Sequence, residues 1–378
     1  MNKNTVSSGK MNLPVVGNYF AIFQWADDAF DKIVGGAPFD KTNLLIIAFV
    51  RTYEKDGKYV ADYENARGTN AYSGEDDAAR IDRLVKTARA KNPDIEILLS
   101  LGYGNNDVDN ATKTSDVFAA SVKKLIERHD LDGFDIDYES VGGVSAEGML
   151  TLTKSLRHAL TNDRIMTITP DVHTSLNLEI LEYFDFVMPQ THDGRLALAN
   201  DFQKILGSYS KIVYGLSSEK ANDPTIYARA ATDNQAAGIF AWRLDTDTRV
   251  NDLPTFEIAQ KMWAWMHSSP FHVKNLTNRA NKTLEVTLII RKGDNPKNTW
   301  DKDIANTLLP GQSLDVPLPQ DANPGKLPFL NGVGIRSGTL YQEQRVETRG
   351  DAFDNLLNTN SKLTITDLPA LCIVGSNP

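Results

Sequence analysis

The stretch that decides the fold is LDGFDIDYES, residues 131–140. Side chains on a β-strand alternate between its two faces, so Asp135, Asp137 and Glu139 would all point the same way. Carboxylates stacked about 7 Å apart on one face would repel one another if all were ionised. At least one of the three is therefore expected to hold a proton near neutral pH, and a protonated carboxyl in a cleft can act as a general acid.

Two other interpretations of this acidic run are less favoured. On a solvated strand face, Phe134 and Ile136 would have to form the buried set, which fits an edge strand better than a central strand. A hard-cation site would need further oxygen ligands, and the nearest acid-rich segment, DVDNATKTSD at 107–116, lacks the glycine of a calcium loop. Like charges stacked on one face inside a fold therefore favour a catalytic role for these three acids.

Nearly continuous apolar runs surround this segment, such as NLLIIAFV, IEILLSLG and GIFAWRL, and they predict parallel strands covered on both faces. Eight such runs lie at 19–25, 43–50, 95–102, 133–139, 165–170, 184–190, 212–216 and 238–244. Amphipathic helical patterns lie between them, at 77–91, 115–129, 145–160, 196–206 and 254–266, with Ser145 as the expected cap of the third. Alternation of this kind over about 250 residues predicts an α/β fold, the (β/α)8 TIM barrel.

Two connections within this pattern stand out. Segment 25–43 contains GGAP and shows no clear helix. The polar insertion at 51–76 follows a strand, so we expect it at the C-terminal face of the barrel, where βα loops build the site. This insertion carries four tyrosines: Tyr53, Tyr59, Tyr63 and Tyr72.

After Pro270 the pattern changes to short β-type runs, such as LEVTLII, SLDVPLP, VGIRSG, KLTIT and ALCIV, separated by turn residues and without a strong helical period. We therefore expect two domains: a catalytic barrel at 1–268 and a small antiparallel all-β domain of the sandwich type at 269–378. The second domain could bind polysaccharide, contact a protein partner or stabilise the barrel. A role in contacting a partner or scaffolding is the interpretation favoured here.

The composition excludes several classes of partner. A net charge of −9 argues against nucleic acid and against an anionic membrane surface, because both need a basic face. Cys372 is the single cysteine, so neither an intrachain disulfide nor a cysteine-based zinc site is expected. No run of about 18 apolar residues predicts a spanning helix. No signal peptide is predicted either; the compartment stays open, with secreted action compatible with the sequence.

At this point a resemblance emerges. The run DGFDIDYE, residues 132–139, matches the DxxDxDxE signature of glycoside hydrolase family 18, the chitinases and endo-β-N-acetylglucosaminidases. SLGYG at 100–104 is similar to the SxGG motif on strand 3 of that family, and GIFAWRLDTD resembles its strand 8. GNYFAIFQW and LLIIAFV resemble strands 1 and 2, so the similarity covers about residues 14–266.

The resemblance implies a mechanism for the three carboxylates. Glu139 would protonate the glycosidic oxygen and later activate water. No enzyme nucleophile is implied, because the 2-acetamido oxygen of the substrate attacks C1 and the anomeric configuration is retained. Asp137 would hold the acetamide N–H and stabilise the oxazolinium intermediate, while Asp135 would lie beneath it and share a proton. No cofactor or metal is implied.

The resemblance also implies binding residues. Trp242 would stack under the −1 sugar, with core filling as the alternative. Many family members carry MxYD on strand 6, with the tyrosine on the acetamide oxygen, whereas VMPQTHDG of this chain resembles the plant-type and bacterial branch, which has a glutamine and then a tyrosine two residues on. Met188 and Gln190 match that pattern, and His192 stands where its tyrosine would be. Histidine can donate a hydrogen bond, but its titration would add pH sensitivity. Tyr214 is a second candidate donor.

Two aromatic residues complete the set of candidates. Tyr19 and Phe49 would line the site from strands 1 and 2, with core packing as an equal alternative.

Three functions stay open, and each involves a carbohydrate containing N-acetylglucosamine. The first is hydrolysis of β-1,4-linked chains, as by a chitinase. The second is an endo-β-N-acetylglucosaminidase acting on N-glycan cores, and the tyrosines of the 51–76 insertion could serve either substrate. The third is a non-catalytic lectin on the same barrel, which would usually lack the glutamate that this chain has at Glu139.

Overall fold

The computed structural model describes residues 11, 13–23, 25–63, 77–102, 106–139, 144–250, 253–267, 273–290, 302–317, 330–347, 352–360, 362–366 and 372–376. The chain divides into two compact units. The first, called the barrel unit, holds Met1–Ala231 and Ala236–Trp263; the second, called the sandwich unit, holds Thr232–Gln235 and Ala264–Pro378.

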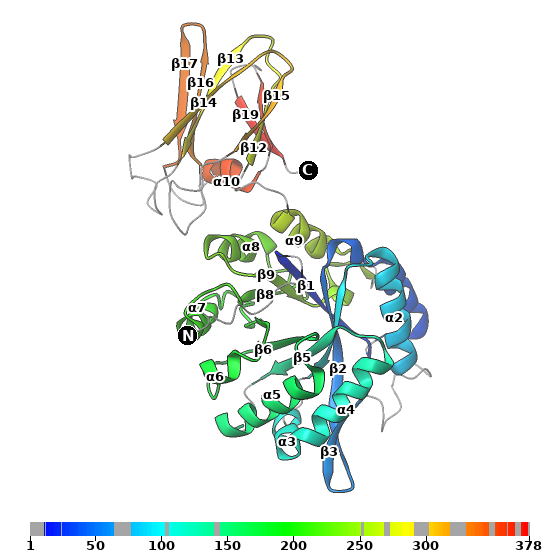
Figure 1. Ribbon diagram of the computed structural model, residues 1–378. Helices are drawn as coiled ribbons and strands as arrows, with labels where there is room; N and C mark the ends of the chain where they lie inside the picture. Colours follow the sequence, from blue (N-terminus) through cyan, green and yellow to red (C-terminus); the bar gives the residue numbers. More distant parts are fainter. Residues whose placement is uncertain are drawn as a thin grey trace. The chain divides into compact units, whose positions relative to one another are not determined.

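Eight parallel strands form the barrel, in the order β7-β6-β5-β4-β2-β1-β9-β8 (Figure 1). They are β1 (Val15–Ala21), β2 (Leu44–Lys55), β4 (Glu96–Leu101), β5 (Gly133–Tyr138), β6 (Ile165–Pro170), β7 (Phe186–Val187), β8 (Val213–Ser217) and β9 (Gly238–Trp242). The ends of this order meet at a parallel bridge between Val187 and Ile212. The predicted (β/α)8 barrel is therefore confirmed.

Helices cover the outside of the barrel (Figure 1). They are α1 (Asp27–Gly36), α2 (Asp77–Lys91), α3 (Asp107–Lys113), α4 (Ser115–Arg128), α5 (Ala146–Leu160), α6 (Leu178–Leu181), α7 (Ala197–Leu206), α8 (Pro224–Asp233) and α9 (Glu257–His267), with short 3-10 turns η1 (Phe39–Lys41) and η2 (Leu244–Thr246). The predicted cap of α5 is present, since the Ser145 hydroxyl accepts the Gly148 N–H at 3.0 Å.

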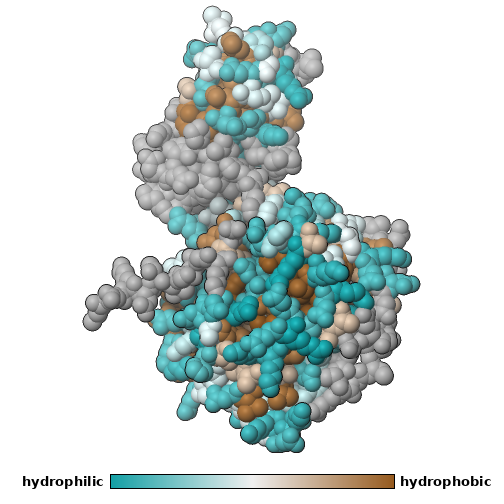
Figure 2. All heavy atoms as spheres, turned by 45° about the vertical axis from the view of Figure 1, so that its right-hand side comes forward, coloured by the Kyte–Doolittle hydropathy of each residue, from teal (hydrophilic) through white to brown (hydrophobic). Residues whose placement is uncertain are grey.

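The outer helix faces are polar. On the face of the barrel unit drawn in Figure 2, hydrophilic residues predominate and hydrophobic ones are scattered. This distribution is expected of helices that turn their apolar residues toward a sheet. Among the described residues, no helix is long and apolar enough to cross a membrane.

Two connections differ from the prediction. The 25–43 segment contains a helix, α1, because Phe30, Ile33 and Val34 recur at i, i+3 and i+4 and are all buried. Residues 107–113 of the acid-rich segment, for which no helix was predicted, form α3, where Asp107 accepts the backbone N–H of Thr52 at 2.6 Å.

The tyrosine-bearing insertion also differs from expectation. β2 continues beyond the barrel and pairs antiparallel with β3 (Lys58–Tyr63), so the insertion starts as a hairpin. The Tyr63 hydroxyl lies 2.6 Å from His129 Nε2, which follows α4, so the hairpin packs on the helical layer. Asp56 and Gly57 join the two strands in a two-residue turn. Both have positive φ, which is typical of tight hairpin turns. Tyr72 lies outside the described residues.

An apolar cluster with members from all the barrel strands except β5 fills the barrel interior. The cluster comprises Met11, Val15, Tyr19, Leu44, Ile46, Ala48, Phe49, Leu98, Ile165, Phe186, Met188, Val213, Ala237 and Phe240, with Phe23 and Trp242 packed against it. Gly133, the glycine of the acidic motif, opens β5 where a Cβ atom would lie 2.0 Å from the Ile165 carbonyl oxygen. Glycine is therefore required for β5 to approach β6.

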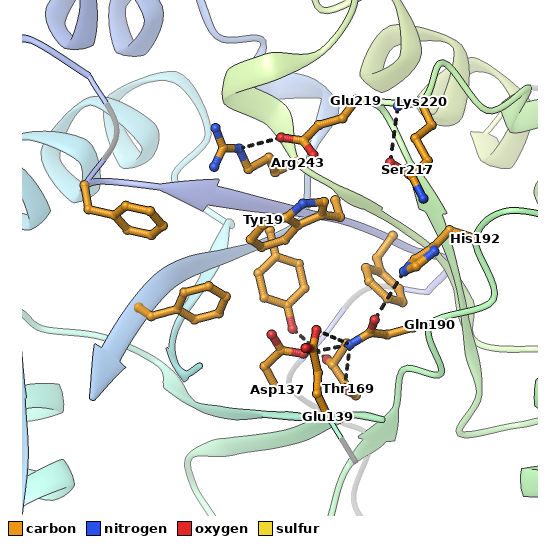
Figure 3. A pocket seen from close by; sticks show the side chains of 14 residues that line it. Tyr19, Asp137, Glu139, Thr169, Gln190, His192, Ser217, Glu219, Lys220 and Arg243 are labelled. Atoms are coloured by element: carbon orange, nitrogen blue, oxygen red, sulfur yellow. Dashed lines mark hydrogen bonds and ion pairs between the residues drawn. The ribbon is translucent and has the colours of Figure 1, made fainter. Parts of the chain in front are cut away.

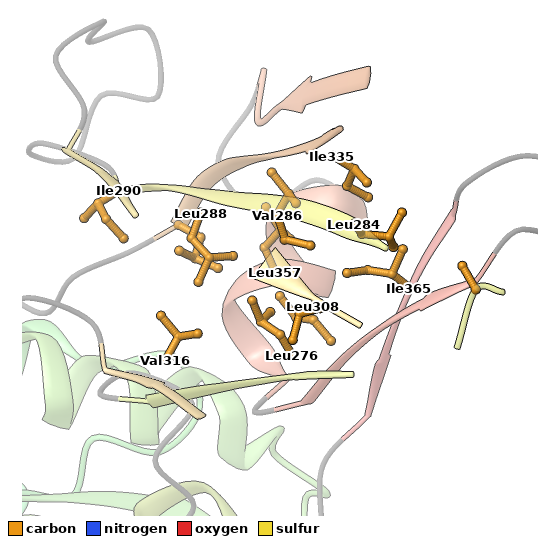
Figure 4. Packing of buried hydrophobic residues seen from close by; sticks show 14 of the residues in the cluster. Leu276, Leu284, Val286, Leu288, Ile290, Leu308, Val316, Ile335, Leu357 and Ile365 are labelled. Carbon is orange, nitrogen blue, oxygen red and sulfur yellow. The ribbon is translucent and has the colours of Figure 1, made fainter. Parts of the chain in front are cut away.

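Two four-stranded sheets form the sandwich unit, in the orders β15-β12-β18-β19 and β14-β13-β16-β17. Their bounds are β12 (Val273–Asn278), β13 (Leu284–Ile290), β14 (Lys302–Leu308), β15 (Ser313–Pro317), β16 (Leu330–Ser337), β17 (Leu340–Arg345), β18 (Lys362–Thr366) and β19 (Cys372–Ser376). Apolar residues of both sheets, such as Leu276 and Val286, share one core (Figure 4). The expected small β domain is therefore present.

Two features of the sandwich unit were not predicted. β12 and β18 pair in parallel, so the domain is not purely antiparallel. A helix, α10 (Ala352–Thr359), contributes Leu357 to the core. Its single buried turn of apolar residues is too short to produce a clear helical period in the sequence.

Candidate active site

A pocket of about 420 Å³ opens where the barrel strands end (Figure 3). Its lining residues are Tyr19, Phe23, Phe49, Asp137, Glu139, Thr169, Gln190, His192, Ser217, Glu219, Lys220, Phe240, Trp242 and Arg243. Glu139 follows β5, Ser217 ends β8 and Trp242 ends β9. The pocket therefore lies at the carboxyl ends of the strands, the place where barrels of this kind carry their sites.

Three acidic residues reach progressively deeper into this pocket. Glu139 is half-buried at the end of β5, Asp137 is 6% exposed, and Asp135 is fully buried beneath them. The first acid of the motif lies elsewhere. Asp132 accepts the Ile97 N–H at 2.8 Å and pairs with Arg89 at 3.0 Å, at the opposite end of the strand.

Four hydroxyl groups surround Asp135. Its two carboxylate oxygens lie 2.7 Å from the Tyr19 hydroxyl, 2.6 Å from that of Ser100, and 2.6 and 3.1 Å from those of Thr167 and Thr169. Burial raises the pKa of Asp135, and these hydroxyl groups oppose the shift. Burial also raises the pKa of Tyr19 well above its ordinary value, so this phenol stays protonated and can donate.

Asp137 and Glu139 share one amide partner. Gln190 Nε2 donates to Asp137 Oδ1 at 2.9 Å and lies 3.4 Å from Glu139 Oε1. Burial, together with the charges of Glu139 and Asp135, raises the pKa of Asp137 well above its ordinary value. Burial raises the pKa of Glu139 as well. The pair therefore holds a proton at a higher pH than isolated carboxyl groups would.

His192 lies on the far side of Gln190 (Figure 3). Its Nε2 is 3.2 Å from Gln190 Oε1, and its Nδ1 is 3.4 Å from Asp193 Oδ2. Asp193 in turn forms an ion pair with Lys220. Burial lowers the pKa of His192 and so favours the neutral imidazole.

Aromatic rings form the apolar wall of the pocket. Trp242 and Phe49 are stacked, with centroids 5.7 Å apart and an interplanar angle of 18°. Phe23 stacks on the other side of Phe49 at 6.2 Å, and Tyr19 meets Trp242 edge-on at 5.4 Å. A Cβ atom at Gly102 would lie 2.0 Å from the Phe49 ring, so the glycine of SLGYG leaves the space that this ring occupies.

Two of the proposed binding residues lie outside the pocket lining. Met188 is fully buried in the barrel core. Tyr214 is buried on β8, where Ser217 faces the pocket. Because side chains alternate along a strand, residues 214 and 217 occupy opposite faces, which places Tyr214 toward the helices.

Several site residues were missed by the sequence reasoning. Ser100 and Thr167 are the direct strand neighbours of Asp135, and Thr169 is the neighbour of Asp137. The alternation of the two threonines in the run MTITP is a signal only once the strand register is known. Phe23, Ser217, Glu219, Lys220 and Arg243 also line the pocket, from strand ends and loops without a distinctive motif.

Within the described ranges, no group of three or more His, Cys, Asp or Glu side chains is arranged to hold a metal ion.

The family model of glycosyl hydrolases family 18 matches residues 18–220, more than half of the chain. The chain belongs to glycosyl hydrolase family 18. The three carboxylates, Gln190 and His192 lie inside the matched range, whereas Trp242 lies beyond it. A search of curated proteins finds no significant match.

Solved structures similar to this family 18 chain include three chitinases. A chitinase from Bacteroides thetaiotaomicron is 20% identical with a TM-score of 0.54, covering 69% of this chain and 99% of the other. Chitinase ChiW from Paenibacillus is 17% identical with a TM-score of 0.53, covering 85% and 40%. The class V chitinase from Nicotiana tobaccum is 13% identical with a TM-score of 0.50, covering 68% and 99%. At these identities the likeness establishes the shared fold.

Proposed function

We propose that this family 18 glycoside hydrolase cleaves β-1,4 linkages between N-acetylglucosamine units, as in chitin and chito-oligosaccharides. The reaction would retain the anomeric configuration and pass through an oxazolinium intermediate. The observation that carries the proposal is the arrangement of Glu139 at the pocket mouth, with Asp137 buried directly behind it and one Gln190 amide bridging the two.

Glu139 would act as general acid and then general base. Its half-buried position would let it reach a glycosidic oxygen in the pocket, and burial, which raises its pKa, favours the protonated form that the first step needs. Once the leaving group departs, the same carboxylate would take a proton from the attacking water.

Asp137 would act on the acetamide of the substrate. A carboxylate that is almost fully buried is well placed to accept the acetamide N–H and to stabilise positive charge on the developing oxazolinium ring. Asp135 would keep Asp137 in position from below, because its own place is fixed by four hydroxyl groups.

Trp242 would form the floor for the sugar at −1. Its ring is partly exposed at the pocket, while stacking on Phe49 and edge contact with Tyr19 hold its orientation. An indole face suits the apolar face of a pyranose. Tyr19 would therefore have two roles, since its hydroxyl also reaches Asp135.

Glu219 is a further carboxylate in the pocket lining, and its contacts differ from those of Asp137 and Glu139. It lines the same pocket, but it lies 3.5 Å from Arg243 and 3.4 Å from the Thr246 hydroxyl. A mechanism with an enzyme nucleophile would require a second carboxylate at the reacting carbon, and Glu219→Gln tests whether Glu219 fills that role.

Product analysis tests the proposal. Colloidal chitin, a chito-oligosaccharide and a high-mannose glycoprotein would be incubated side by side with wild type, with Glu139→Gln and with Glu219→Gln. The proposal expects chito-oligosaccharide products that are lost in Glu139→Gln and retained in Glu219→Gln. Release of the glycan alone would identify an endo-β-N-acetylglucosaminidase. Binding of chitin without cleavage of any substrate would identify a lectin.

A further inference from the structure

The orientation of the Gln190 amide is fixed by its surroundings. Its Nε2 lies 2.9 Å from Asp137 Oδ1, 3.4 Å from Glu139 Oε1 and 3.4 Å from the Thr169 carbonyl oxygen. All three are hydrogen-bond acceptors, so the NH₂ group and not the oxygen must face them. Gln190 Oε1 consequently points the other way, to His192 Nε2 at 3.2 Å.

This amide oxygen in turn selects the tautomer of His192. An acceptor at 3.2 Å requires a proton on Nε2, because two acceptors facing each other would be repulsive. The neutral ring then leaves Nδ1 without its proton, next to Asp193 at 3.4 Å. The ion pair between Lys220 and Asp193 offsets the carboxylate charge that the unprotonated Nδ1 faces, which reduces the repulsion between them.

We propose that His192 is a positioning residue, which holds the Gln190 amide in the orientation that donates to Asp137 and Glu139. It would act through Gln190 and would not need to touch the substrate. This role differs from the one expected of the residue at this position, a hydrogen bond to the acetamide. Its catalytic consequence rests on the proposed function, but the orientation itself does not.

The consequence is a change in the proton affinity of the carboxylate pair. N–H groups that donate to carboxylates stabilise their ionised forms, and Gln190 lowers the pKa of both Asp137 and Glu139. Without the His192 donor, Gln190 could turn its oxygen toward the pair and accept a proton from it, which would favour the protonated forms. Both pKa values of the pair would then rise.

Other charges around these groups would stay in place. The groups that act on His192 are Asp193, Arg195 and Lys220, and those that act on the pair include Asp135 and Asp171. None of them replaces the donor that Gln190 Oε1 requires. The expected shift is therefore assigned to the amide orientation and amounts to about one pH unit, the effect of roughly one charge-assisted hydrogen bond.

The kinetic test compares three variants over pH with a soluble chito-oligosaccharide. His192→Phe keeps an aromatic ring at this position and removes the donor, so both limbs of the kcat/KM profile should move up by about one pH unit. His192→Gln places an amide N–H near the position of Nε2 without a titrating group, and it should return both limbs toward the wild-type positions. His173→Gln is the matched control, an exposed histidine 4.0 Å from Asp201 and outside the pocket lining. Limbs that stay in place in His192→Phe, or that move equally in His192→Gln, would overturn the proposal.

Nuclear magnetic resonance supplies a readout that needs no activity. Ring ¹⁵N shifts should show His192 as the Nε2–H tautomer when neutral, and ¹³C titration should show the Asp137 and Glu139 carboxyls titrating higher in His192→Phe. The Nδ1–H tautomer would refute the proposed orientation. If these signals behave as expected while no substrate is hydrolysed, the proposed function fails and the positioning role stands.

Discussion

Asp137→Asn removes one negative charge from the pocket and keeps the shape of the side chain. The Gln190 N–H at 2.9 Å can still donate to the asparagine oxygen, so the geometry of the site should persist. What is lost is a buried charge facing the oxazolinium. Removing one preorganised electrostatic group costs about 3–4 kcal/mol in the transition state, or roughly 10²–10³-fold in kcat. The ground state carries little positive charge, so KM should change by much less.

The assay is kcat and KM on a soluble chito-oligosaccharide, with thermal unfolding to verify the fold. Asp137 is buried beside two other carboxylates, so losing its charge should leave the unfolding temperature unchanged or raise it. Asp132→Asn is the matched control, because it changes an acid of the same motif outside the pocket lining. If Asp137→Asn raised KM alone and left kcat unchanged, Asp137 would be a binding residue and the mechanism would be refuted.

Four further outcomes are expected. Glu139→Gln should remove activity on an aryl chitobioside by about 10²–10⁴-fold while the protein stays folded, and a loss of less than threefold would exclude Glu139 as the acid. Asp135→Asn should move the limb of the pH–rate profile that reports Asp137 to lower pH, because the charge of Asp135 raises the pKa of Asp137; an upward shift would contradict this coupling. Fully deacetylated chitosan should be inert, since it lacks the acetamide, and rapid cleavage would exclude substrate assistance. Burial lowers the pKa of Lys274 to about 7, so the unfolded chain binds more protons between about pH 7 and 10.5 and stability should rise with pH across that window. Calorimetry should find this rise in wild type and not in Lys274→Met; equal slopes would show that Lys274 does not cause it.

The barrel could be predicted because its strands and helices have distinct periods. Covered parallel strands read as continuous apolar runs, and β5 placed its acids on one face by simple alternation. Helix α1 was missed because its two final glycines, Gly35 and Gly36, obscured a short apolar repeat. The hairpin β2–β3 was missed although Asp56-Gly57 is a typical hairpin turn, because the polar residues Glu54, Lys55 and Lys58 flank it in place of an apolar alternation.

Candidate site residues that lie on one strand could be predicted from the sequence. Those contributed by several neighbouring strands could be predicted less well. Asp137 and Glu139 follow from a single run of sequence. The hydroxyl groups around Asp135 come from β1, β4 and β6, so their convergence depends on register, which the sequence does not state. Tyr214 was chosen for its chemistry, and the pleat of β8 turns it away from the pocket.

The central claim is that the acetamide of the substrate acts as the nucleophile. It is tested most directly with aryl β-chitobiosides in which the N-acetyl group of the sugar bonded to the aryl group carries zero, one, two or three fluorine atoms. Fluorine withdraws electrons from the amide oxygen and weakens its attack on C1, so log kcat/KM should fall steeply with each added fluorine. Rates that do not change along the series would show that the oxygen takes no part in the bond-breaking step and would contradict the account.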